Sequence, residues 1–294
     1  MARGRATTLP LMPIALVTGA NSGIGRATTI GLARDGAHVI AAGRSAERTQ
    51  PVLDEIAGFG GSAEFLELDL ASLTSVRTAA QSFLDTGRNL DLLVNNAGIG
   101  VNRRGLTEDG FEVHFGINHL GHFLLTRELF PNLGPESRVV ALTSALHFRA
   151  DGVDFTRVRR PTAFTGLAEY ATSKLANVLF IRELARRRPG IRAYAVHPGL
   201  VRTRLIPGPI RVLSASSMVS PEQGADTVLW CATSEDVASE SGQYYQQRTR
   251  LPPSARAQDD DLARELWERS DEWCEKAHQV ASRSWSRISI TAAT

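Results

Sequence analysis

Tyr170 and Lys174 stand four positions apart in the run Tyr170-Ala171-Thr172-Ser173-Lys174. On a helix, residues at this spacing share a face, so the ammonium group would lie beside the phenol. A free phenol has a pKa of about 10, and a neighbouring cation favours phenolate and lowers that pKa. The pair is therefore typical of a group that exchanges a proton with a reacting oxygen. Most such pairs simply lie on a helix surface, so this interpretation depends on other residues.

The rarity of lysine in this chain supports a role for Lys174. The chain has 33 basic side chains, but only two of them are lysines, Lys174 and Lys276. Lysine carries a compact ammonium group with rotatable donors, whereas arginine carries a planar fork. A lysine at this position indicates a need for a point charge beside the phenol.

A glycine-rich turn precedes the first expected helix. Thr18-Gly19-Ala20-Asn21-Ser22-Gly23-Ile24-Gly25 follows an apolar run and opens a helical pattern. Glycines let the backbone turn tightly and approach a pyrophosphate, and a helix N-terminus supplies free N–H donors. The strand–turn–helix context favours a dinucleotide site over a merely structural turn.

The end of the second expected strand bears on which dinucleotide binds. An acidic residue there binds the ribose 2′-hydroxyl of NAD, whereas an arginine accommodates the 2′-phosphate of NADP. The sequence reads Ala41-Ala42-Gly43-Arg44, and the first acidic residue after it is Glu47. Arg44 can pair bidentately with a phosphate. We therefore expect NADP(H) to be favoured over NAD(H); a solvated loop arginine is the alternative.

Composition excludes several classes of protein. The net charge of +2 is too small to indicate a nucleic-acid partner. No apolar run reaches the length of about 18 residues that a membrane span requires. Residues 1–13 lack the apolar core of a secretory signal, so we expect a disordered lead-in and a cytoplasmic location. Two cysteines, Cys231 and Cys274, make no disulfide framework and are expected to be buried.

Apolar runs alternate with helical patterns along the chain. Strands are expected at Ile14–Thr18, His38–Ala42, Ala63–Glu67, Asp91–Asn95, Arg138–Ser144, Arg192–His197 and Gly242–Tyr245. Helices are expected at Gly23–Asp35, Glu47–Phe59, Ser72–Asp85, Glu108–Phe130, Tyr170–Arg187, Pro221–Thr233 and Asp260–His278. This order predicts one α/β domain over residues 14–279, a doubly wound Rossmann fold with a seven-stranded, mostly parallel sheet and helices on both faces. Residues 280–294 are expected to form a loose tail.

Two longer irregular stretches, Ala145–Glu169 and Leu200–Ser220, border the carboxyl edge of this sheet. Ligands bind at that edge in folds of this kind. The second stretch is apolar, with Leu205, Ile206, Pro207, Pro209, Ile210, Val212 and Leu213. An apolar lid favours a lipophilic substrate, although these residues could instead pack only on their own protein.

Together the motifs resemble the single-domain branch of the short-chain dehydrogenase/reductase family, from about Ile14 to Tyr245. The matching residues follow the family's order, namely Thr18–Gly25, Asp69-Leu70, Asn95-Asn96-Ala97-Gly98, Asn118, Ser144, Tyr170-x-x-x-Lys174 and Pro198-Gly199-Leu200-Val201-Arg202-Thr203. Within the family, the run Asn118–Thr126 is similar to retinol-dehydrogenase-like and WW-domain-oxidoreductase-like members. That branch oxidises or reduces lipophilic aldehydes, ketones and alcohols.

The resemblance implies a catalytic tetrad of Asn118, Ser144, Tyr170 and Lys174. Tyr170 would exchange the proton, Ser144 would hold the substrate oxygen, and Asn118 would hold a water that links Lys174 to solvent. The implied cofactor contacts are Gly19, Asn21, Ser22, Gly23, Ile24, Gly25, Arg44, Asp69, Leu70, Asn96, Ala97, Gly98, Tyr170, Lys174, Pro198, Gly199, Val201 and Thr203. The implied substrate contacts are Ser144, His147, Tyr170 and Leu205.

Family members form dimers or tetramers through the two long helices, Glu108–Phe130 and Tyr170–Arg187, so a homodimer or homotetramer stays open. Several other polar residues have weaker claims to function. His147 either faces the pocket or is a solvated loop histidine. His119 and His122 have no third ligand at a useful spacing, so we expect packing and no metal. Three arginines before the tyrosine helix are interpreted as a solvated face, with an anionic substrate as the alternative: Arg157, Arg159 and Arg160.

The sequence thus predicts an NADP-dependent carbonyl reductase or alcohol dehydrogenase acting on a small lipophilic molecule. Its Arg- and Ala-rich composition suits a bacterial protein, for which a secondary metabolite is one candidate substrate. A regulatory protein that binds NADP without turnover is the main alternative, but such relatives usually lose the tyrosine or lysine. A nucleotide-sugar epimerase or dehydratase would use a T-G-x-x-G-x-x-G turn, which the spacing of Gly19, Gly23 and Gly25 does not match.

Overall fold

The computed structural model describes residues 12–161, 164–201 and 218–291, with side chains up to residue 277. These residues form one eight-stranded sheet in the order β3-β2-β1-β4-β5-β6-β7-β8. The first seven strands run parallel. They are β1 (Ile14–Thr18), β2 (His38–Gly43), β3 (Ser62–Glu67), β4 (Leu92–Asn95), β5 (Arg138–Leu142), β6 (Arg192–His197) and β7 (Gln243–Gln246). The predicted doubly wound Rossmann architecture is confirmed.

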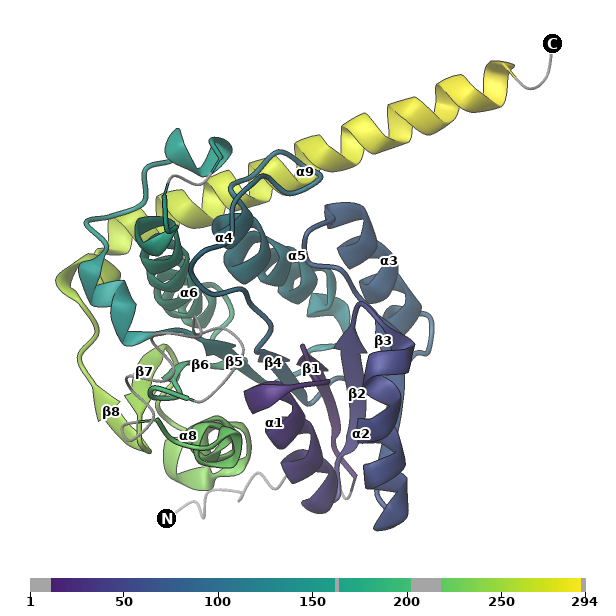
Figure 1. Cartoon of the computed structure of the whole chain (residues 1–294), viewed down its shortest axis with the longest axis vertical. Coiled ribbons are helices and arrows are strands. Elements are labelled where there is room, and N and C mark those ends of the chain that lie inside the picture. The colour runs from purple at the N-terminus through teal and green to yellow at the C-terminus, as the bar shows by residue number, and fades with distance from the viewer. Residues whose placement is uncertain (1–11, 162–163, 202–217, 292–294) are drawn as a thin grey trace, which may run out of the picture.

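Helices cover both faces of the sheet (Figure 1). One face carries α1 (Gly23–Arg34), α2 (Ala46–Gly58) and α8 (Pro221–Thr233). The other carries α3 (Leu73–Leu84), α4 (Val113–Phe115), α5 (Gly121–Glu128) and α6 (Leu167–Arg187). The central strands are buried on both sides because both layers pack against them, which explains their nearly continuous apolar sequences. The carboxyl ends of these strands meet at one edge of the sheet.

The predicted sheet lacked the eighth strand, β8 (Thr249–Leu251), and extended β5 to Ser144, whereas β5 ends at Leu142. Strand β8 pairs antiparallel with β7 across a two-residue turn. Both turn residues, Gln247 and Arg248, adopt positive φ angles of 50° and 53°. Turns of this kind usually carry Asn-Gly or Gly-Gly, so the sequence held no signal for the hairpin. All three residues of β8 are exposed, which also removes any apolar alternation.

The helix predicted at Glu108–Phe130 is shorter and contains an irregular turn. It begins at Val113 because Gly110 adopts a left-handed φ of 75° and the Glu112 carboxylate caps the backbone N–H groups of His114 and Phe115. A π-helical turn, Gly116–Leu120, follows α4 and leads into α5. Such turns occur mostly at functional sites, and this one contains Asn118. The tyrosine helix, by contrast, begins three residues earlier than predicted, at Leu167.

The last helix, α9 (Asp260–Thr291), continues beyond His278, where the sequence analysis ended it. It crosses the outer side of α6, α5 and α3 (Figure 1). The Trp267 ring packs edge-on against Phe123 at 5.0 Å and stacks on Phe180 at 5.8 Å. This packing places α9 over the two helices through which dimers or tetramers were expected. Within the described residues, no helix is both long and apolar enough to cross a membrane.

Candidate active site

The glycine-rich turn lies between β1 and α1 and presents a free helix N-terminus. Ser22 is the N-cap residue, and its side chain makes no capping hydrogen bond, so the first N–H groups of α1 are left for another acceptor. At Gly25, a Cβ atom would lie 2.2 Å from the Gly19 carbonyl oxygen. Gly19 itself adopts a φ of 68°. These features fit a bound pyrophosphate, and they place Asn21, Gly23 and Ile24 in the same turn.

The Thr18 hydroxyl joins this turn to the end of β4. It accepts hydrogen bonds from the backbone N–H groups of Asn96 at 3.0 Å and Ala97 at 2.9 Å. The Asn96 side chain donates in return to the Thr18 carbonyl at 2.7 Å. Asn96 and Ala97 therefore fix the spacing between the two strands that flank the expected dinucleotide. Sequence reasoning quoted Thr18 only as part of a motif and missed this linking role.

His122 extends that link to the π-helical turn. Its Nε2 atom lies 2.8 Å from the Thr18 hydroxyl, and its Nδ1 atom lies 3.1 Å from the Asn118 carbonyl oxygen. Because a carbonyl only accepts, Nδ1 carries the proton and Nε2 accepts from the hydroxyl. Complete burial lowers the pKa of His122 to about 4, which keeps the ring neutral. The expected packing role is correct, but the ring also positions two elements of the site.

The Asn118 side chain is fully engaged within the protein. Its Oδ1 atom accepts from the Ile99 backbone N–H at 2.8 Å, and its amide donates to the Ile99 carbonyl and to the Ser173 hydroxyl. Gly98 lies against this amide, because a Cβ atom there would be 2.9 Å from Oδ1. Asn118 thus ties the loop after β4 to α6. Its predicted role in holding a water stays a prediction.

Ser144 and Tyr170 meet at the carboxyl edge of the sheet. Ser144 lies two residues beyond β5 and caps a 3-10 turn (Ala145–Arg149). Burial raises the pKa of Tyr170, and a hydrogen bond from the side chain of Ser144 opposes this in part. A lowered pKa was expected from Lys174 beside the phenol, and that expectation is wrong for this arrangement, in which burial raises the pKa. The phenol is protonated at neutral pH, as a free phenol also is.

Lys174 lies beside the phenol, with Nζ 5.7 Å from the centre of the Tyr170 ring. Nζ donates a hydrogen bond to the Leu142 carbonyl at 3.1 Å. Burial lowers the pKa of this ammonium group to about 8. The shared helix face predicted from the four-residue spacing is confirmed. The Thr143 hydroxyl also donates a hydrogen bond to the Lys174 backbone carbonyl at 2.7 Å, which attaches α6 to the end of β5.

The other expected cofactor contacts lie around the same edge. Arg44 directly follows β2 and is exposed. Asp69 accepts the backbone N–H of Ala71, and Leu70 is buried beside it. After β6, Pro198 and Gly199 lead to the buried Val201. Two expected contacts, Thr203 and Leu205, lie outside the described residues, as does most of the apolar stretch Leu200–Ser220.

Two further histidines near the site are buried and contact protein groups. His147 is fully buried, so the interpretation as a solvated loop histidine is wrong, and both of its ring nitrogens are hydrogen-bonded. His119 packs against Phe115 and Phe123 and contacts the Ser270 hydroxyl on α9. Burial lowers the pKa of His119 to about 3. Across the described part of the chain, no three His, Cys, Asp or Glu side chains are grouped as metal ligands.

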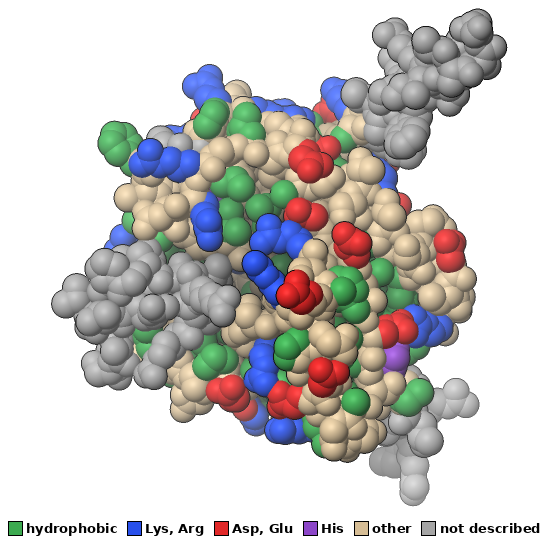
Figure 2. Space-filling view, turned by 45° about the vertical axis from the view of Figure 1, so that its right-hand side comes forward, with side chains coloured by type: hydrophobic (Ala, Val, Ile, Leu, Met, Phe, Trp, Pro, Cys, Tyr) green, Lys and Arg blue, Asp and Glu red, His purple; other side chains and the backbone are tan. Residues whose placement is uncertain are grey.

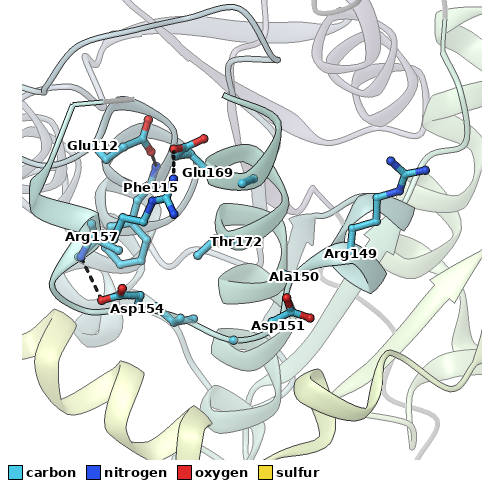
Figure 3. A pocket seen from close by; sticks show the side chains of 13 residues that line it. Glu112, Phe115, Arg149, Ala150, Asp151, Asp154, Arg157, Glu169 and Thr172 are labelled. Carbon is cyan, nitrogen blue, oxygen red and sulfur yellow. Dashed lines mark hydrogen bonds and ion pairs between the residues drawn. The ribbon is translucent and has the colours of Figure 1, made fainter. Parts of the chain in front are cut away.

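A separate cavity of about 400 Å³ lies beside α6, between this helix and the loop that precedes it (Figure 3). Ala168, Glu169 and Thr172 contribute from α6, on the side that helical periodicity places away from Tyr170 and Lys174. The lining mixes acidic side chains, among them Glu112 and Asp154, with apolar ones such as Phe115. This cavity is therefore distinct from the expected substrate site.

The three loop arginines are exposed, as expected, but two of them also contact other residues of the protein. Arg157 reaches Glu169 across the cavity at 3.3 Å (Figure 3). Arg159 stacks on the Phe111 ring at 3.5 Å and donates to the Asp109 carbonyl, so it serves packing. Arg160 is exposed, and its charge contributes to lowering the pKa of Asp154. Elsewhere on the surface, basic and acidic side chains are interspersed (Figure 2), as the small net charge suggested.

Known proteins resemble this chain over most of its length. The short chain dehydrogenase family profile matches residues 13–207. Human dehydrogenase/reductase SDR family member 13 is 43% identical over 87% of this chain and 71% of its own length. Mouse polyprenol dehydrogenase is 41% identical over 90% and 84% of the two chains. Human retinol dehydrogenase 14 is 39% identical over 87% and 84%.

Solved structures agree with the sequence relatives. An uncharacterised protein from Mycobacterium Paratuberculosis is 34% identical, covers 91% of this chain and 95% of its own, and superposes with a TM-score of 0.76. A short chain dehydrogenase from Burkholderia cenocepacia, solved in complex with NADP, is 30% identical over 84% and 99% of the two chains, with a TM-score of 0.67. Fold, site geometry and relatives agree: the chain belongs to the short-chain dehydrogenase/reductase family, as an oxidoreductase similar to retinol dehydrogenases.

Proposed function

We propose that this enzyme uses NADPH to reduce lipophilic ketones or aldehydes. The proposal rests mainly on one observation, the convergence of a protonated phenol, a serine hydroxyl and a buried ammonium group beside a dinucleotide-binding turn. Bound NADPH would supply the hydride. The residues of the chain then have to hold the carbonyl, stabilise charge on its oxygen and deliver a proton to it.

Each of these tasks has a candidate residue. The Ser144 hydroxyl would donate a hydrogen bond to the substrate oxygen and hold it against Tyr170. Tyr170 would donate its proton to that oxygen as negative charge develops on it, since the phenol is protonated at neutral pH. The Lys174 ammonium would then stabilise the phenolate that is left. The same residues could run the reverse reaction, and it is the expected use of NADPH that favours reduction.

The preference for NADP rests on the loop after β2. Arg44 is exposed there, and the nearest following acid, Glu47, lies in the first turn of α2. A guanidinium group can bind the 2′-phosphate bidentately, and the related Burkholderia protein was solved with NADP. A carboxylate at the end of the strand, which would repel that phosphate, does not occur between Gly43 and Ala46.

A lipophilic substrate is supported by the mouth of the site and by the named relatives. Phe148, just after Ser144, is 53% exposed, and Leu200, just after β6, is 45% exposed. Exposed apolar side chains at a ligand-binding edge favour apolar ligands. The relatives named for retinol and polyprenol carry the same implication for this chain. A long-chain aldehyde is therefore the first substrate to test.

Fluorescence titration with NADPH and NADH tests the cofactor proposal. We expect NADPH to bind at least about tenfold more tightly, and the preference to disappear in Arg44→Ala, because the charge-assisted bonds to the phosphate are lost. Arg264→Ala is the matched control, since Arg264 lies on α9 and pairs with Asp261. Equal binding of both cofactors by the unaltered protein would refute the assignment of Arg44.

A further inference from the structure

His147 occupies a position from which it can hold Ser144. It lies three residues after Ser144 in the 3-10 turn, with its side chain fully buried. Its Nδ1 atom is 2.7 Å from the Ser144 carbonyl oxygen. Its Nε2 atom is 3.1 Å from the backbone nitrogen of Ser254, in the segment that follows β8. The ring therefore bridges two segments that are 107 positions apart in the sequence.

The two partners determine the protonation state of the ring. A carbonyl oxygen only accepts a hydrogen bond, so Nδ1 must carry a proton. A backbone N–H only donates, so Nε2 must present its lone pair. Both bonds exist together only in the neutral Nδ1–H tautomer. Burial lowers the pKa of His147, which favours this neutral form.

We propose that neutral His147 is a positioning residue that fixes the Ser144 hydroxyl for catalysis by donating a hydrogen bond from Nδ1 to the Ser144 carbonyl, in the tautomer that the N–H of Ser254 selects. The Ser144 carbonyl also accepts the backbone N–H of His147 at 3.0 Å. Two donors thus hold the plane of this peptide, and with it the direction in which the Ser144 side chain leaves the backbone. The inference rests on the proposed function, because it assigns His147 a role in that reaction.

The surroundings of the ring explain why it is held rigidly. The His147 ring packs at 4.1 Å from the Phe148 ring and at 5.0 Å from the Tyr244 ring on β7. Three titratable groups lie nearby: Tyr244, His197 at the end of β6, and Lys174 on α6. Burial above all lowers the pKa of His197 to about 4, with further contributions from His147 and Lys174, so His197 stays neutral and adds no positive charge near neutral pH.

Two substitutions separate the bonds of the bridge. The amide nitrogen of an asparagine reaches about the place of Nδ1, whereas the amide of a glutamine reaches about the place of Nε2. His147→Asn therefore keeps the hydrogen bond to the Ser144 carbonyl and loses the one from the Ser254 N–H. His147→Gln keeps the bond from the Ser254 N–H and loses the one to the Ser144 carbonyl. Each variant loses one buried hydrogen bond, so similar losses of thermal stability are expected from the two. The proposal predicts that His147→Gln lowers kcat at least about tenfold and that His147→Asn restores most of it.

The result that would overturn the proposal is an equal kcat for the two variants at saturating NADPH and aldehyde. NADPH affinity should change little in either variant, since no bond to the expected dinucleotide site is removed. An unaltered protein that reduces no carbonyl at all would instead refute the proposed function and this inference with it. The two failures are therefore distinguishable.

A second pair of variants decides the matter even if the His147 variants fail to fold. Ser254 has a φ of −57°, which proline can adopt. Ser254→Pro removes the N–H that requires the lone pair of Nε2, whereas Ser254→Ala removes only the hydroxyl that caps Ala257. Without that N–H, nothing selects the Nδ1–H tautomer, and the proton can move to Nε2, which leaves Nδ1 unable to donate to Ser144. We expect kcat to be at least about fivefold lower in Ser254→Pro than in Ser254→Ala, with NADPH affinity unchanged. Equal kcat values in the two variants would contradict the proposal.

Discussion

At the scale of single residues, the site depends on which polar groups are charged. Burial raises the pKa of the neutral Tyr170 phenol and lowers the pKa of the Lys174 ammonium to about 8. Neighbouring histidines, His122 and His147, are neutral because burial lowers their pKa values as well. A single ammonium group thus lies beside the phenol, among neutral hydrogen-bonded rings.

This arrangement predicts an alkaline limit to activity. The pKa of Lys174 is lowered, so its protonated form is lost as the pH rises through about 8, and kcat should fall above that value. Lys174→Arg keeps a positive charge at all accessible pH values, so its kcat–pH profile should lack this limb. Its kcat should also be about tenfold lower or worse, because a planar fork fits the space of an ammonium poorly. The same limb in the variant would show that another group is responsible.

At the scale of elements, the sequence predicted the strands and the residues at their ends well. Buried parallel strands have a strong apolar signal, and the glycine turn, Ser144 and the tyrosine helix follow from it. The β7–β8 hairpin could not be predicted, because Gln247 and Arg248 are not typical turn residues. The bridge from Ser144 through His147 to Ser254 was also unpredictable, because it joins segments distant in sequence and depends on the ring's burial.

The turn between β1 and α1 supplies a prediction at this scale. In Gly25→Ala the new methyl group would meet the Gly19 carbonyl, which must move. We expect NADPH binding to weaken about tenfold or more, since overpacking of this kind costs roughly 1–3 kcal/mol. Gly58→Ala is the control: it lies at the end of α2 with nothing within 4 Å of an added Cβ. Calorimetric titration of both variants should show the loss only in Gly25→Ala; an unaffected Gly25→Ala would argue against a pyrophosphate at this turn.

At the scale of the whole molecule, α9 adds a further helix outside α5 and α6, on the side away from the sheet. Leu266, Trp267 and Cys274 are buried where it crosses these helices. Arg127 on α5 adds ion pairs to Asp271 and Glu275. The covered surface is the one through which the family resemblance predicted dimers or tetramers. We therefore expect any assembly of this protein to use other surfaces.

Removing a central ring of α9 tests how much this helix stabilises the fold. Trp267→Ala should lower the free energy of unfolding by about 3–5 kcal/mol, the usual cost of truncating a buried aromatic side chain. Leu106→Ala, at a position that is 43% exposed, should change it by less than about 0.5 kcal/mol. Urea unfolding of both variants, followed by circular dichroism, measures the difference. A loss below about 1 kcal/mol in Trp267→Ala would mean that α9 is only loosely attached.

The most direct test of the central claim is the oxidation of NADPH by the purified protein with a long-chain aldehyde, comparing the unaltered enzyme with Tyr170→Phe. The control is Tyr194→Phe. Tyr194 lies on β6, and its hydroxyl donates to the Val237 carbonyl. Our account predicts turnover that falls roughly 10²- to 10⁴-fold in Tyr170→Phe, with NADPH affinity retained, because a general acid is lost. Turnover that survives in Tyr170→Phe would contradict it, since the account assigns the transferred proton to Tyr170.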